Sequence, residues 1–149
     1  MMSVTFERDK AHWLFRFSPE EWVFAGVGEA KRAEEAYARG DTRGGLAASR
    51  RAAGMALNGV LIVDESTRSG WGRTYMDHLA HLRADSSAPE VVRAAAATLL
   101  DTPPPGQTLV VLRTKSSGGR VIEASRDVIA HAYALVSRGQ ASDLAGGRS

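Results

Sequence analysis

The 149-residue chain contains no cysteine, which excludes disulfide scaffolds, thiolate zinc sites and cysteine nucleophiles. It also lacks a long hydrophobic run. The longest apolar stretch, from Met55 to Val63, is interrupted by Asn58 and Gly59 and has about half the length of a membrane span. The first ten residues carry acids where a signal peptide would carry a basic patch and then an apolar run. We therefore expect a cytoplasmic protein with no membrane segment.

Several enzyme signatures are absent as well. The chain has no G-x-S-x-G, no P-loop and no H-E-x-x-H motif. Gly26-Val27-Gly28 lies inside a predicted helix and lacks the third glycine and the preceding strand of a dinucleotide-binding loop. No cofactor and no bound metal are expected from these motifs.

A large excess of charge of one sign is also missing, because 19 basic side chains face 17 acidic ones. The net charge of +2 falls well short of the basic excess typical of a dedicated nucleic-acid-binding protein. The surplus lies in residues 102–149, which hold six basic and three acidic side chains. Arg113, Lys115 and Arg120 lead into the last predicted helix and are the candidate RNA-binding residues.

Helix signals divide the first half of the chain into two helices. Ser18-Pro19-Glu20-Glu21 combines an N-cap, a first-turn proline and a capping-box glutamate, which predicts a helix over residues 18–39 with Gly40 as its C-cap. Asp41 or Thr42 caps a second helix that runs to about residue 64. Its predicted core positions recur at helical spacing: Leu46, Ala53, Leu57, Val60 and Leu61.

The second half alternates short helices with connecting segments. A polar loop over residues 65–72 precedes a short helix in which Tyr75, Leu79 and Leu82 stack. Ser87-Ala88-Pro89-Glu90 predicts a second capping box, opening a helix that ends before Pro103. We expect an extended segment over 108–113, a mobile loop over 115–119, and an amphipathic helix over 120–138 that Gly139 ends.

These elements predict an all-α protein, an up-and-down bundle of four to five helices over residues 18–138. An extended segment over residues 1–17 precedes the bundle. Its partly alternating residues from His12 to Phe17 are compatible with a short strand or hairpin. Residues 139–149 are expected to form a flexible tail.

Two histidines lie one helical turn apart, His78 and His81, beside Asp77. This grouping has no third ligand nearby in the sequence, so a metal site is not favoured. Both are expected on the helix surface.

The last predicted helix carries Arg126 and His131, separated by four residues. A histidine near its usual pKa can exchange a proton with a ribose 2′-hydroxyl that attacks its own phosphate. An arginine can stabilise the charge that develops on the phosphate oxygens. Arg73 and His78 share the same spacing, so spacing alone does not single out the pair.

Helical geometry separates these two side chains. Residues five apart lie about 140° apart around the helix and about 7.5 Å along it. The apolar residues of this helix cover one arc of about 160°, and Arg126 and His131 lie just beyond its opposite borders. A shared site would need a distorted helix, or the Arg and His of two subunits meeting across a two-fold axis. The alternative is that both side chains only flank a core stripe.

The segments 30–37, 49–61, 77–82 and 126–133 together resemble the HEPN superfamily (higher eukaryotes and prokaryotes nucleotide-binding domain) over about residues 20–137. Arg126-Asp127 through His131-Ala132-Tyr133 resembles the family's Arg-polar-x-x-x-His motif, including its trailing tyrosine. The resemblance implies a helical bundle that forms a homodimer. In active members, two such motifs line a cleft at the dimer interface and cleave RNA without metal, often as bacterial toxins or in phage defence.

Two functions follow from the resemblance. In the first, the chain is a metal-independent endoribonuclease with Arg126 and His131 catalytic and Asp127 orienting the pair. Tyr133 would support the interface or be a modification site. In the second, it is a non-catalytic module that binds a nucleotide or a separate protein, such as an antitoxin or a nucleotidyltransferase. A third alternative is a helical protein that shares only composition with the family.

Overall fold

The computed structural model describes residues 13–64, 74–103 and 114–147, which form five α-helices and one 3-10 turn and contain no strand. The α-helices are α1 (Pro19–Ala38), α2 (Thr42–Val63), α4 (Tyr75–Ala84), α5 (Glu90–Asp101) and α6 (Thr114–Gly147). This arrangement confirms the predicted all-α bundle. The predicted loop over 65–72 and extended segment over 108–113 lie outside the described residues.

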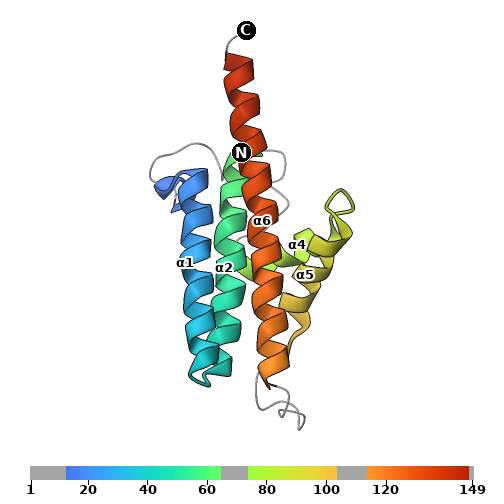
Figure 1. Ribbon diagram of the computed structural model, residues 1–149. Coiled ribbons are helices and arrows are strands. Elements are labelled where there is room, and N and C mark those ends of the chain that lie inside the picture. The colour runs from blue at the N-terminus through green and yellow to red at the C-terminus, as the bar shows by residue number, and fades with distance from the viewer. Residues whose placement is uncertain (1–12, 65–73, 104–113, 148–149) are drawn as a thin grey trace.

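The two long N-terminal helices form an antiparallel hairpin, and α6 lies beside them (Figure 1). Helix α6 runs in the same direction as α2, with α4 and α5 in the connection between them. Helix α2 is the central element, since it packs against α1, α4, α5 and α6. All five of its predicted core residues are buried: Leu46, Ala53, Leu57, Val60 and Leu61.

The predicted ends of the first helix are confirmed. The Ser18 hydroxyl accepts a hydrogen bond from the Glu21 backbone N–H, and the Glu21 carboxylate accepts one from the Ser18 N–H, at 3.1 and 2.8 Å. Gly40 follows the helix with a φ of +84°, a conformation that favours glycine. Asp41 then caps α2 by accepting a hydrogen bond from the Gly44 N–H.

The described part of the N-terminal segment is a 3-10 turn, where the sequence was compatible with a short strand or hairpin. Residues Trp13–Arg16 form a 3-10 turn, so the prediction of a strand there is wrong; residues 1–12 lie outside the described part. The turn is held by Trp22 on α1, whose indole N–H donates to the Leu14 carbonyl oxygen at 2.8 Å. Rings of Trp13 and Phe17 pack edge-on against Trp22. Aromatic packing onto the start of α1 therefore replaces the pairing that a strand would need.

The second capping box lies on a different helix from the one predicted. Pro89 is the N-cap of α5 and provides no side-chain hydrogen bond, while the Ser87 hydroxyl donates to Asp85 at 2.6 Å. The capping box is instead formed by Thr74 and Asp77 at the start of α4. Ser87 sits too far before the first helical turn, because Pro89 itself takes the cap position.

Helix α6 is longer at both ends than the sequence indicates. It includes residues 115–119, so the predicted loop there is wrong, and it passes through Gly139 to Gly147. A Cβ at Gly118 would lie 2.9 Å from the Tyr37 ring, and one at Gly139 would lie 2.9 Å from the Val63 Cβ. These glycines therefore mark close helix contacts, where the sequence pattern suggested breaks. Figure 1 shows α6 extending past the ends of α1 and α2.

Candidate functional site

Arg126 lies on the side of α6 that faces α1. Its guanidinium forms an ion pair with Glu34 of α1, and 62% of its side chain is exposed. Ile129 and Ala132 on the same helix are buried in the core, as the amphipathic pattern predicts. Arg126 is therefore fixed at the edge of the contact between α1 and α6.

His131 lies on the other side of α6 and is half-buried. Burial lowers the pKa of its imidazole, and the nearby positive charge of Arg138 lowers it further, while Asp85 acts in the opposite direction. The neutral imidazole, which can accept a proton, is thus favoured near pH 7. Its charged neighbours are Asp85 and Arg138, so in one chain the electrostatic surroundings of His131 do not include Arg126.

The remaining predicted site residues do not gather around His131. Tyr133 is 51% exposed on the Arg126 side, although the sequence pattern placed it within the apolar arc. Asp127 is partly exposed and has no ion-pair partner among the described residues. Arg120 is exposed and lines a separate shallow pocket with the C-terminal end of α5. Lys115 lies on α6 but its side chain, like all of Arg113, is outside the described part.

An apolar groove with a volume of about 390 Å³ lies between α1 and α6. Its floor is formed by buried side chains that include Val23, Ala30 and Ile129. Its rim exposes 62% of Phe24 and 45% of Val27. We call this surface the α1/α6 groove; it is lined by Val23, Phe24, Val27, Ala30, Lys31, Glu34, Arg126, Ile129, Ala130 and Tyr133.

The capping signals locate the ends of the first helix and do not reveal the groove. The available signal was the spacing of Phe24, Val27 and Lys31, three and four residues apart, which places them on one face of the helix. Whether that face turned toward the core or toward solvent depended on where α6 packs, which the sequence does not specify.

The prediction that His78 lies on the helix surface is wrong, because its side chain is completely buried. Its Nε2 lies 3.0 Å from the Asn58 Oδ1 of α2, which is also completely buried. The pair joins α4 to the central helix. No three potential metal ligands come together in the described part of the chain, and His78 serves the core.

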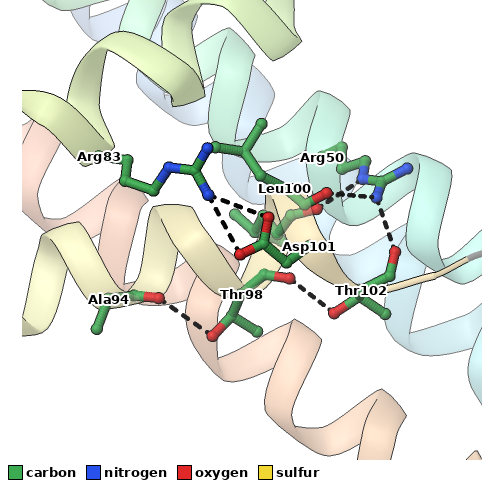
Figure 2. A network of polar contacts seen from close by, with 8 residues as sticks. Arg50, Arg83, Ala94, Thr98, Leu100, Asp101 and Thr102 are labelled. Atoms are coloured by element: carbon green, nitrogen blue, oxygen red, sulfur yellow. Dashed lines mark hydrogen bonds and ion pairs between the residues drawn. The ribbon is translucent and has the colours of Figure 1, made fainter.

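Two arginines of α2 have structural partners. Arg51 donates to the buried Glu29 carboxylate of α1 at 2.7 Å, and Arg32 donates to the same carboxylate at 2.8 Å. Burial by itself raises the pKa of Glu29, but these two arginines outweigh that effect and lower it overall. Arg50 donates to the carbonyl oxygens of Leu99 and Thr102 at 2.7 and 3.0 Å, which caps the C-terminal end of α5 (Figure 2).

Comparisons of the chain with protein-family models, with curated proteins and with solved structures gave no match. Among the described residues, no helix is long and apolar enough to cross a membrane.

Proposed function

We propose that the chain is a protein-binding helical module that docks its partner in the α1/α6 groove. One observation supports this most strongly: the groove exposes Phe24, Val27 and Tyr133 together over an apolar floor. Contiguous exposed apolar side chains on a small protein mark interaction sites, and aromatic side chains are enriched in such contacts. A groove between two helices fits an amphipathic helix with apolar residues at intervals of three and four.

The charged end of the groove supports a protein partner over a nucleotide. Glu34 neutralises Arg126 there, which leaves Lys31 as the single unpaired cation among the described lining residues. A nucleotide phosphate is better held by several unpaired cations or by a glycine-rich loop at a helix start. The composition of the groove thus favours an apolar contact bordered by charge.

Photo-crosslinking tests this function directly. A benzophenone amino acid placed at Tyr133 in the full chain is expected to form a discrete adduct in cells after irradiation. The same group at Ala94, an exposed position on α5, serves as the control. Substituting Val27 by Glu is expected to abolish the Tyr133 adduct without changing the helical circular dichroism. An equal yield of adduct at both positions would contradict docking in the groove.

A metal-independent endoribonuclease, of the toxin or phage-defence type, is the second candidate. The lowered pKa of His131 supports it, since a neutral imidazole can take the proton from a ribose 2′-hydroxyl. The oxygen then attacks the adjacent phosphate, giving a 2′,3′-cyclic phosphate, and the protonated imidazole returns the proton to the departing 5′-oxygen. Arg126 of a second subunit would stabilise the charge on the phosphate. Ala134 is exposed, and around the axis of α6 its direction lies between those of Arg126 and His131. Its small side chain favours close approach of two α6 helices.

RNA cleavage in the presence of a chelator tests this second candidate. Single-stranded RNAs of varied sequence are expected to be cut by the wild-type dimer and left intact by the His131→Ala variant. His81→Ala, on α4, is the matched control and is expected to retain cleavage. If the wild-type protein leaves every RNA intact at high concentration, the enzyme hypothesis is wrong.

A further inference from the structure

One side of α1 carries a regular line of four residues, of which Phe24, Val27 and Lys31 are exposed and Glu20 is half-buried. Glu20, Phe24, Val27 and Lys31 follow one another at intervals of four, three and four, the spacing that keeps side chains on one seam between paired helices. We call these four residues the α1 seam. Its two central residues are the exposed apolar rim of the α1/α6 groove, and Tyr133 lies beside them.

The charges at the two ends of the α1 seam are opposite and free of ion-pair partners within the described residues. Glu20 lies one turn before Phe24 and Lys31 one turn after Val27. By contrast, Glu29 and Glu34 on the same helix are each paired with arginine. The α1 seam is therefore an apolar centre with an unpaired anion at one end and an unpaired cation at the other.

We propose that the partner in the α1/α6 groove is a second copy of this chain, whose α1 packs antiparallel to the first across a two-fold axis. This inference rests on the proposed function and names its partner. When the axis passes midway between Phe24 and Val27, Phe24 of each copy meets Val27 of the other. The same operation places Glu20 of each copy opposite Lys31 of the other. A two-fold axis forms every such contact twice, so the complementarity is satisfied at both ends.

Neighbouring registers lack this complementarity. An axis passing at Val27 places Glu20 of one copy opposite Glu34 of the other, a carboxylate that is already paired with Arg126, so Glu20 gains a like charge and no cation of its own. An axis passing at Phe24 places Val27 opposite Glu21, whose carboxylate is already used in the capping box. Like charges across an interface suppress a wrong register, so the α1 seam selects one alignment.

Sedimentation equilibrium of the purified full chain, with charge reversals, tests the proposal. We expect a wild-type dimer whose dissociation constant rises about tenfold in Glu20→Lys and in Lys31→Glu, because each substitution removes two exposed ion pairs. The double variant is expected to return close to the wild-type value. Glu90→Lys is the matched control: like Glu20, Glu90 is a glutamate in the first turn of a helix, so its reversal changes the charge at a helix terminus without touching the α1 seam.

Rescue by the double charge reversal establishes the antiparallel register. A wild-type chain that is monomeric at 1 mM, or single reversals that weaken the dimer no more than Glu90→Lys, would overturn the proposal. A double variant weaker than both single variants would do the same. The Tyr133 crosslink separates this failure from failure of the proposed function: an adduct with a different protein keeps the groove as a docking site and rejects the second copy.

Discussion

Gly26 and Gly28 are two residues apart on α1 and are expected to respond to alanine in opposite directions. A Cβ built at Gly26 lies 2.7 Å from the backbone oxygen of Ala52 and 3.3 Å from the Cβ of Ala56. A Cβ built at Gly28 meets nothing within 4 Å. The two sites share a helix and a substitution, so the difference between them isolates the contact with α2.

The expected magnitudes follow from this geometry. Alanine in place of glycine in a helix interior gains about 1 kcal/mol from helix propensity alone, so Gly28→Ala is expected to raise the free energy of unfolding by about 0.5–1 kcal/mol. At Gly26 the obstructing atom belongs to the backbone of α2 and cannot rotate away. The helices must separate by several tenths of an ångström, and overpacking of this kind costs about 1–3 kcal/mol. Gly26→Ala is therefore expected to lower the free energy of unfolding by up to about 2 kcal/mol after the propensity gain is subtracted.

Urea denaturation followed by circular dichroism at 222 nm measures both changes. It should be repeated at two protein concentrations, so that self-association is separated from the stability of the fold. If Gly26→Ala stabilises the chain as much as Gly28→Ala does, then α1 does not approach α2 at Ala52 and the described hairpin is wrong.

Three further predictions concern the polar groups of the core. Arg50→Met is expected to destabilise the fold by about 2 kcal/mol, because it strips carbonyl oxygens at the end of α5 of their donor. Hydrogen exchange should rise first in α5. Glu29→Gln is expected to cost about 2 kcal/mol in urea denaturation, less than a fully buried pair, since its partners Arg51 and Arg32 stay partly hydrated. The pKa of His131 is lowered in the folded chain, so its contribution to stability is complete above its ordinary pKa of about 6.5 and is lost as the pH falls from there through the lowered pKa, because the unfolded chain takes up the proton first. His131→Gln should therefore flatten the fall in unfolding free energy between pH 7 and 5; an unchanged slope would show that another group controls it.

The candidate site shows which features of the structure the sequence pattern predicts and which it does not. The turn of about 140° between Arg126 and His131 follows from helical geometry, and the structure places them on opposite sides of α6 as that angle requires. The neighbours of these two side chains did not follow from helical geometry. Glu34 lies on α1 and Asp85 directly follows α4, and no local spacing brings these residues next to α6.

Burial of polar residues was also outside the reach of the local pattern. His78 looks like a surface residue on its own short helix, because its neighbours Asp77 and His81 are polar. It becomes a core residue because Asn58, which interrupts the apolar run of α2, offers it a hydrogen-bond partner. Each of these polar residues weakens a local prediction, and the contact between them forms only after the helices pack.

By itself, the sequence determined the elements whose signals are local. The capping box at Ser18, the glycine at position 40 and the apolar spacing of α2 fixed the helical hairpin, since each acts within a few residues of the chain. Tertiary packing decided the rest. Glycines at 118 and 139 became sites of helix contact, where their local preference is to end a helix, because the rings and methyl groups they meet come from α1 and α2. Packing also left one side of α1 uncovered, so that Phe24 and Val27 face solvent beside α6. Apolar side chains in a helix predict only that one face will be buried. The three-dimensional arrangement decides whether the core or another molecule covers that face.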